Sequence, residues 1–473
     1  MPTSKPRLAV ISTYDDLCGI AGYTKPIVKL LEEYFDVTVF DLDQFIFKNK
    51  SPTVQRLADR ELMAFCKTLH QYDSVNLQLE HGTLGNTART ISRRLRLIVR
   101  SSPNITITFH TMLTDFSTPG LTFLRECIRG RPAKGFADYR KAKHDNLLAG
   151  SFYRFLRRQQ RSRRISLIVH TRRDARLLKV LYGLKNVHDH PLASLTAAHA
   201  REVLSSATRD NFPALRGLPP GSVVLGCFGF LSRYKGVDTA LRAMQLLPEN
   251  YHLAIFGATH PNTILEQATV DPFVKKLMRL VNPERTMLDA ANGKRTSLTL
   301  SGNDLTHLVE SPHPTNLTHR VHFMGALNDA DFPSAMAVCD TVLLPYLEVG
   351  QSSSGPLNWA IALGKHILAS RNKTFLQALR YFPGRFRTFD IGNYVELAEV
   401  AAVESHSGDP RKQQFPFPEN YSTETNIELY RSLLLPDRPL RDASRNGRAD
   451  EDIVRLPARR MATRETIGGP TDG

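Results

Sequence analysis

The sequence has few cysteines and no long apolar run. Its cysteines are widely spaced, odd in number and form no Cys-x-x-Cys pair; they are Cys18, Cys66, Cys127, Cys227 and Cys339. This distribution disfavours a zinc cluster or a disulfide framework and predicts reduced thiols in a cytoplasmic protein. No window approaches the roughly 18 uninterrupted apolar residues of a membrane-spanning helix. The opening stretch MPTSKPRLAV also lacks the apolar core of a signal peptide.

Acidic residues are too few to balance the basic ones. The chain of 473 residues has 62 Lys and Arg against 46 Asp and Glu, which gives a net charge of +16. Such an excess predicts an anionic partner: nucleic acid, anionic lipid or a phosphorylated ligand. The sequence shows no zinc-finger or RNA-binding signature and no aromatic and glycine platform among its arginines, so no nucleic-acid partner is expected.

Part of the positive charge is concentrated in the stretch FYRFLRRQQRSRR, Phe152–Arg164. Its arginines adjoin the apolar side chains of Phe152, Tyr153, Phe155 and Leu156. A basic amphipathic helix of this kind can lie on an anionic membrane surface, which would place a cytoplasmic protein at the inner face of the membrane. The alternative is a solvated helix face without a lipid partner.

Short apolar runs alternate with helical patterns in both halves of the chain. The predicted strands are Arg7–Thr13, Asp36–Asp43, Ser74–Glu80, Ile105–Thr111, Ser166–Thr171, Val223–Phe230, Tyr251–Gly257, Arg320–Gly325 and Thr341–Tyr346. Strands that alternate with helices are typical of parallel α/β sheets. The segment LRGLPPGS, Leu215–Ser222, interrupts the alternation and predicts a linker.

The predicted organisation is two Rossmann-like domains that face each other across a cleft. The first covers residues 1–212 and the second residues 222–420, in which the long segment Pro261–His319 fits neither pattern. A capped helix over residues 421–435 is expected to pack back on the N-terminal domain. Residues 436–473 are rich in Arg, Asp, Gly and Pro and predict a disordered tail. In folds of this class, ligands bind at the carboxyl ends of the strands.

The stretch VGQSSSGPLNWAIALGK, Val349–Lys365, combines the features of a phosphate-binding loop. It follows an apolar run that predicts a buried strand, and Pro356 and Gly364 suit the start and the end of a helix. Residues 351–355 would then form a loop at a helix N-terminus. Unpaired N–H groups and about half a positive charge favour an anion there. An ordinary serine N-cap without a ligand is the alternative.

Several blocks of the sequence stand in a fixed order: Gly19–Thr24, Leu77–Gly82, Thr108–Thr111, His170–Leu178, Gly229–Leu247, Arg320–Tyr346 and Leu357–Ser370. Together they resemble retaining GT-B glycosyltransferases of the group 1, or family four, type, in a variant of the polysaccharide-assembly kind. No single block is specific, but their order and spacing over residues 7–435 are. The resemblance implies a GT-B fold and the transfer of a hexosyl group, with mannosyl and glucosyl transfer both open, from a nucleotide-diphosphate-sugar.

The resemblance also assigns residues to the donor side of the site. Lys235 matches the family's phosphate-binding lysine, and Arg233 lies beside it, so both would neutralise the leaving diphosphate. The other expected donor-binding residues are Gly229, Gly350, Gln351, Ser352, Ser353, Ser354, Gly355 and Asn358. The nucleotide-sugar is itself a substrate, so no cofactor is expected. No DxD-like motif lies in a suitable loop, so no metal is expected either.

On the acceptor side, the resemblance points to the loops that follow N-terminal strands. His110 comes directly after a predicted strand and would lie near the donor sugar. Glu80 and His81 would contact acceptor hydroxyls, and Gly19 and Gly22 would permit a close backbone approach to a ligand. Each residue also has a purely structural interpretation, since the chain holds 16 histidines in all.

The sequence departs from the family pattern in the donor loop. The family usually has two glutamates eight positions apart, and those positions are Gly350 and Asn358 here. The Asn358 amide can still bond a ribose hydroxyl, because it offers both a donor and an acceptor. Gly350 cannot replace a carboxylate, which leaves Glu348 or Gln351 for that role. The usual basic residue of the earlier loop falls at Phe230.

We therefore expect a metal-independent glycosyltransferase that adds a sugar to a hydroxyl of a glycan or lipid-linked glycan in cell-surface polysaccharide synthesis. Retention at the anomeric carbon follows from the resemblance alone. The alternative is a non-catalytic GT-B scaffold that binds a sugar nucleotide or a partner enzyme, and the missing glutamates motivate it.

Overall fold

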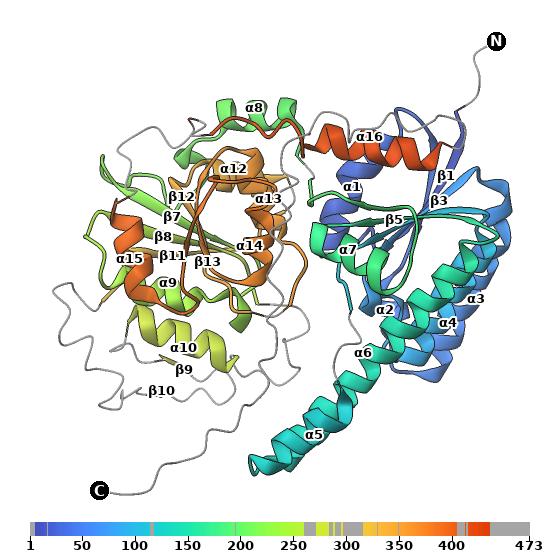
Figure 1. Cartoon of the computed structure of the whole chain (residues 1–473). Coiled ribbons are helices and arrows are strands. Elements are labelled where there is room, and N and C mark those ends of the chain that lie inside the picture. The colour runs from blue at the N-terminus through green and yellow to red at the C-terminus, as the bar shows by residue number, and fades with distance from the viewer. Residues whose placement is uncertain are drawn as a thin grey trace, which may run out of the picture. The chain divides into compact units, whose positions relative to one another are not determined.

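The computed structural model describes most of the chain up to residue 435. The described residues are 5–16, 18–113, 118–193, 195–259, 271–282, 287–288, 295–296, 316–328, 330–348, 350–403, 412 and 415–435. They contain two parallel sheets of six strands each, with helices between the strands (Figure 1). The predicted tail and most of the unassigned segment 261–319 lie outside these ranges.

The first sheet has the strand order β2-β1-β3-β4-β5-β6, and every neighbouring pair is parallel. Its strands are β1 (Arg7–Ser12), β2 (Asp36–Asp41), β3 (Ser74–Leu79), β4 (Asn104–Phe109), β5 (Arg164–Val169) and β6 (Val187–Asp189). Every residue of β3 and β4 is buried, which is typical of central strands covered on both faces. The five strands predicted in this half are confirmed, and the short strand β6 is additional.

Helices connect these strands and cover the first sheet. They are α1 (Gly19–Leu31), α2 (Gln44–Phe47), α3 (Pro52–Thr68), α4 (Ala88–Ser101), α5 (Pro119–Ile128), α6 (Pro132–Gln159) and α7 (Arg172–Leu181), with single 3-10 turns at Leu69–Gln71 and His81–Leu84. α4 illustrates how the sequence sets a helix. The Thr87 hydroxyl caps its start by accepting from Thr90 N at 3.2 Å, and Ile91, Leu95 and Ile98 recur at helical spacing on its buried face.

The second sheet has the order β11-β8-β7-β12-β13-β14 and is also parallel throughout. Its strands are β7 (Val223–Phe228), β8 (Tyr251–Phe256), β11 (Val321–Gly325), β12 (Thr341–Leu344), β13 (His366–Ser370) and β14 (Arg387–Phe389); β9 (Met287–Leu288) and β10 (Arg295–Thr296) form a separate antiparallel pair. The four strands predicted here are confirmed. The strand β14 is itself too short for its sequence pattern to have predicted it.

The second half has its own helices and its own buried core. The helices from residue 195 onward are α8 (Ala197–Ser206), α9 (Val237–Met244), α10 (Pro272–Val281), α12 (Asp331–Ala337), α13 (Gly355–Ala362), α14 (Lys373–Ala378), α15 (Tyr394–Val403) and α16 (Thr423–Leu434), with 3-10 turns at Arg209–Asn211 and Arg233–Lys235. Ala200 and Val203 of α8 pack with Leu195 and Phe212 in the core of the second sheet. The chain therefore enters this core near Leu195, earlier than the expected boundary at residue 212.

The helix α16 returns to the first sheet and packs on it. Its Ile427 and Tyr430 share a buried cluster with Leu8 of β1 and Tyr23 of α1. The Tyr430 hydroxyl lies 2.6 Å from Thr108 Oγ1 and accepts from Gln78 Nε2 at 3.1 Å. A segment from the far end of the described chain is thereby bonded to the two central strands of the N-terminal sheet.

The structure corrects the interpretation of Phe152–Arg164 as a membrane-binding helix. Phe152, Tyr153, Phe155 and Leu156 belong to α6 and are buried in the core of the first sheet. The helix ends at Gln159 and β5 begins at Arg164, so the stretch is not one amphipathic helix. The spacing of its apolar side chains suits a core helix as well as a lipid-facing one, so the sequence pattern does not separate the two. In the structure these side chains face protein. Within the described ranges, no helix is both long and apolar enough to span a bilayer.

Replacing Tyr430 by phenylalanine should destabilise the protein. The substitution removes one hydroxyl and leaves the buried Gln78 Nε2 and Thr108 Oγ1 without that partner, at a cost of about 1–3 kcal/mol. Urea unfolding should therefore show a lower midpoint for Tyr430→Phe. Tyr34→Phe is the matched control, since this half-buried ring packs beside Arg431. Equal midpoints for both variants would show that the hydroxyl does not secure α16.

Candidate functional site

Both sheets reverse their strand order at one point. In the first sheet the reversal lies between β1 and β3, and in the second between β7 and β12. Helices leave such a pair of strands toward opposite faces, so their carboxyl ends leave room for a ligand. In the second sheet, the loops at this position are residues 229–236 after β7 and residues 345–354 after β12.

Glycines let these two loops approach each other. Gly236 has a positive φ of +64°, and a Cβ atom there would lie 1.8 Å from the carbonyl oxygen of Pro345. Gly229 has a φ of +108°, and its missing side chain leaves the space that the Lys235 side chain occupies at 3.1 Å. Only glycine combines this backbone conformation with so close a contact. This approach places Lys235 beside Tyr346, the residue that follows Pro345.

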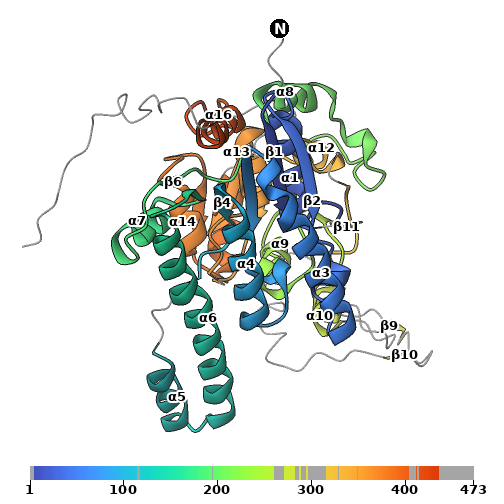
Figure 2. The same ribbon diagram turned by 90° about the vertical axis from the view of Figure 1, so that its right-hand side faces the viewer.

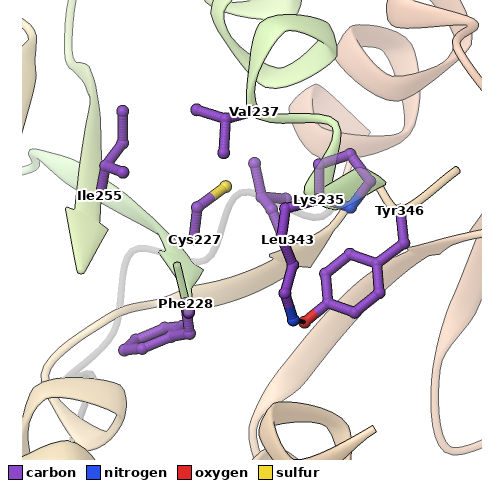
Figure 3. Close-up of a pocket in the computed structure, with 9 residues that line it drawn as sticks. Cys227, Phe228, Lys235, Val237, Ile255, Leu343 and Tyr346 are labelled. Atoms are coloured by element: carbon purple, nitrogen blue, oxygen red, sulfur yellow. Dashed lines mark hydrogen bonds between the residues drawn. The ribbon is translucent and has the colours of Figure 1, made fainter. Parts of the chain in front are cut away.

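Lys235 is buried in a small pocket between these loops. Its Nζ donates to the Tyr346 hydroxyl at 2.6 Å and lies 3.9 Å from the centre of the same ring (Figure 3). The lining also includes Cys227, Phe228 and Leu343. Burial lowers the pKa of Lys235 to about 7, because the charged ammonium loses its hydration. The amine is therefore poised between its charged and neutral forms near neutral pH.

Tyr346 links this lysine to the start of α13. Its hydroxyl also lies close to the Ser354 side chain, and Ser354 is the N-cap of α13. The Ser354 Oγ accepts from Leu357 N at 3.4 Å, and Asn358 Nδ2 donates to the Ser354 carbonyl oxygen at 2.6 Å. The predicted boundary between loop and helix is confirmed. Sequence reasoning missed Tyr346, although its position directly after a strand and Pro345 was a usable signal.

The rest of the loop before α13 is held by backbone contacts. The Glu348 carboxylate accepts from Gly350 N at 3.1 Å and from Lys373 N at 2.8 Å. Gly350 has a φ of +78°, which favours glycine. Thr374 Oγ1 donates to the Gln351 carbonyl oxygen at 2.6 Å. Glu348 thus shapes the loop through main-chain contacts in this structure.

The remaining donor-side residues lie at different depths. Ser353 is half-buried, Arg233 is exposed, and the Cβ position of Gly355 is open. Ser352 Oγ accepts from Met112 N at 3.4 Å, and the Ser352 side chain lies close to the Asp174 carboxylate. The loop before α13 is therefore in contact with residues that follow β4 and β5.

Two histidines lie side by side at the carboxyl ends of β4 and β5. These strands pair with Phe109 opposite Val169, so the next residues, His110 and His170, are neighbours. His110 Nδ1 lies 3.4 Å from His170 Nε2, and His110 Nε2 lies 2.9 Å from Gln78 Oε1. Both nitrogens of the His110 ring therefore face protein groups. His170 was not predicted as a site residue; its place after a strand parallel to that of His110 was the signal.

The hydrogen-bond partners of these two histidines leave no proton between the two rings. Gln78 Nε2 donates to Asn76 Oδ1 at 2.7 Å, which turns the Gln78 oxygen toward His110. His170 Nδ1 faces the His190 carbonyl oxygen at 3.1 Å. Both outer partners are acceptors, so two neutral rings must leave their inner nitrogens without hydrogen. Burial lowers the pKa of His170 to about 4 and that of His110 well below its usual value, which keeps both rings neutral.

The other acceptor-side residues lie near the same edge of the first sheet. Glu80 Oε2 accepts from Thr111 Oγ1 at 2.6 Å, and burial raises the pKa of Glu80. His81 is only 4% exposed, so its ring is not on an open surface. Gly19 and Gly22 form the first turn of α1, and the Cβ position of Gly19 is open. Within the described part of the chain, no group of three or more His, Cys, Asp or Glu side chains is arranged to hold a metal ion.

Comparisons with known proteins identify the fold. No family model and no curated protein matches the sequence. The structure is similar to Anabaena HepE in complex with UDP and glucose, with a TM-score of 0.53 and 14% identity over 90% of this chain and 98% of that one. It is also similar to a glycosyltransferase from Rickettsia africae, with a TM-score of 0.54 and 12% identity over 91% of this chain and 99% of that one.

A further similar structure is the UDP-forming α,α-trehalose-phosphate synthase from Burkholderia xenovorans in complex with glucose-6-phosphate. Its TM-score is 0.54, with 8% identity over 91% of this chain and 100% of that one. At such low identity these similarities establish the fold alone. The chain has the GT-B fold, with two Rossmann-like sheets of parallel strands, and the predicted fold class is confirmed.

The pKa of Lys235 predicts a pH dependence of stability. The native amine has a pKa of about 7 and the unfolded amine about 10.4, so the unfolded chain binds more protons between these values. The free energy of unfolding should therefore rise with pH in this window relative to Lys235→Met, by up to about 3 kcal/mol between about pH 7 and 9.5. Urea unfolding of both proteins at several pH values measures this difference. A difference that stays constant would mean that the amine is hydrated and fully charged.

Proposed function

We propose that the protein is a glycosyltransferase that transfers a sugar from a nucleotide-diphosphate-sugar. The observation that carries this proposal is the convergence of Lys235, Tyr346 and the capped start of α13 at the strand-order reversal of the second sheet. In a GT-B fold, a lysine amine and a helix N-terminus at this position suit a diphosphate.

The proposed donor site supplies charge where the leaving group develops it. The start of α13 would present the partial positive charge of its helix dipole to the phosphate oxygens, while Leu357 N stays bonded to Ser354 Oγ. Lys235 would donate to the diphosphate from the pocket wall, and the exposed Arg233 would add a second cation. These contacts strengthen as the bond to the sugar breaks and negative charge collects on the diphosphate, so they stabilise the transition state.

On the acceptor side, we propose different roles for His110 and Glu80. Both ring nitrogens of His110 face protein groups, so His110 would contact the sugar through its main chain or ring face. Glu80 Oε2 accepts from Thr111 Oγ1, and since each carboxylate oxygen can accept more than one hydrogen bond, Glu80 could also bind an acceptor hydroxyl. The proposed acceptor is a hydroxyl of a glycan or lipid-linked glycan, in cell-surface polysaccharide synthesis.

The finer assignments of the reaction rest on the sequence resemblance. We propose that transfer retains the anomeric configuration, needs no metal ion and moves a hexosyl group such as mannosyl or glucosyl. In that reaction the leaving phosphate can itself take the acceptor proton, so no separate base is required. Gly350 and Asn358 in place of two glutamates favour the second candidate function, a scaffold that binds a sugar nucleotide without turnover.

Donor binding should depend on Lys235. HepE was solved with UDP and with UDP-glucose, so UDP-sugars are the first donors to test, beside GDP-, ADP- and dTDP-sugars. A ligand that binds only the folded state raises the melting temperature. Lys235→Met should weaken binding of the preferred donor about 10- to 100-fold, since it removes one charge-assisted hydrogen bond. Lys179→Met, at an exposed position of α7, is the matched control and should bind as the wild type does.

Turnover separates the two candidate functions. Release of nucleoside diphosphate from the bound donor, to water or to a panel of glycan acceptors, supports a transferase. Saturable binding without any release across acceptors would support the scaffold. No melting shift with any of the four donor classes would contradict a donor site at α13 in either case.

Donor binding should also take up a proton. At about pH 8 most Lys235 amines are neutral in the free protein, and a diphosphate beside the amine raises its pKa. Calorimetry in buffers of different ionisation enthalpy should therefore show an uptake approaching one proton per bound nucleotide. Lys235→Met should abolish most of this uptake. Equal buffer dependence in both proteins would place the proton elsewhere.

A further inference from the structure

The helices α5 and α6 form an antiparallel hairpin that extends away from the first sheet (Figures 1 and 2). Where the helices meet, a Cβ atom on Gly135 would lie 3.1 Å from the Phe123 carbonyl oxygen, so the two backbones are close. The Phe123 and Tyr139 rings meet edge to face at 6.5 Å. From Leu148 onward, the apolar face of α6 is buried in the core of the first sheet. The hairpin is therefore a packed pair of helices, one of which continues into the core of the N-terminal domain.

The outer face of α5 carries an exposed apolar stripe. Leu121, Leu124 and Ile128 are spaced by three and four residues, so they lie on one face of the helix. Their exposed fractions are 65%, 55% and 78%, and Phe136 on α6 adds a ring that is 56% exposed. Large aliphatic side chains grouped in this way mark an interaction surface more often than isolated ones do.

The hairpin carries more basic than acidic residues. Residues 119–147 contain seven Lys and Arg and three Asp and Glu. The buried Glu126 carboxylate is already paired with Arg129 at 3.0 Å, Arg131 at 3.1 Å and Lys134 at 3.6 Å. Arg125 is exposed on the same face as the apolar stripe. An exposed apolar stripe with cationic neighbours is complementary to the anionic headgroups and the acyl boundary of a lipid bilayer.

We propose that this hairpin docks the protein on an anionic lipid bilayer. Leu121, Leu124 and Ile128 enter the boundary between headgroups and acyl chains, and Arg125 pairs with lipid phosphates. The surface is a different one from Phe152–Arg164, whose aromatic rings are buried. Docking does not depend on glycosyl transfer. If the proposed function holds, it brings a lipid-linked acceptor near the carboxyl edge of the first sheet.

Sedimentation of the full chain with vesicles tests the proposal. The wild type should bind vesicles of equal parts phosphatidylglycerol and phosphatidylcholine and should bind pure phosphatidylcholine vesicles much more weakly. The double variant Leu124→Glu, Ile128→Glu should lose at least tenfold in binding, because both side chains would carry charge into the bilayer. Arg125→Gln should lose about fivefold, as expected for one basic residue near an anionic surface.

The matched control is Val180→Glu, Leu181→Glu on α7, where the replaced side chains are 70% and 55% exposed. This variant should bind vesicles nearly as the wild type does. Equal losses in both double variants would mean that added charge alone weakens binding and would overturn the proposal. So would an absence of wild-type binding to the anionic vesicles at low salt.

A second copy of the chain is the other occupant that the stripe would suit, and light scattering on a sizing column detects it. A dimer that dissociates in Leu124→Glu, Ile128→Glu, without vesicle binding by the wild type, would overturn lipid docking. Donor-induced melting shifts are measured on the same proteins. Loss of vesicle binding with an unchanged donor response shows that the variant is folded and separates this proposal from the proposed function.

Discussion

The candidate donor site depends on the close approach of two loops that are more than a hundred residues apart in sequence. Gly236 leaves no room for a side chain against the Pro345 carbonyl oxygen. A larger residue would push the loops apart, and the hydrogen bond from Lys235 to Tyr346, at 2.6 Å, allows little such movement. The sheet makes the approach possible because β7 and β12 are paired neighbours with divergent connections.

Strand pairing organises the first sheet in the same way. The register of β4 and β5 puts His110 next to His170, and β3 supplies Gln78 to both His110 and Tyr430. The helix α16, which begins at Thr423, is therefore bonded to β3 and β4 near their carboxyl ends. The buried hydroxyl, amide and imidazole groups satisfy one another across three segments, so movement of α16 would disturb the acceptor side directly.

The sequence predicted much of the fold and less of the site. Runs of β-branched and aromatic residues such as ITITF, Ile105–Phe109, identify strands of the sheet, because these side chains suit the β conformation. Short edge strands such as β6 lack this signal. The aromatic residues of α6 have the same spacing whether they face a core or a lipid, so Phe152 was misassigned. Tyr346 and His170 were missed because their roles come from strand register and loop contact, which a single sequence does not display.

Lys235 lies in a pocket whose described lining residues include no carboxylate. Burial lowers the pKa of this amine, because its charged form loses hydration. A carboxylate in the pocket would keep the amine charged and paired before any ligand arrived. In the proposed function, the charge of Lys235 then develops when the diphosphate enters, which directs it to the group that must leave.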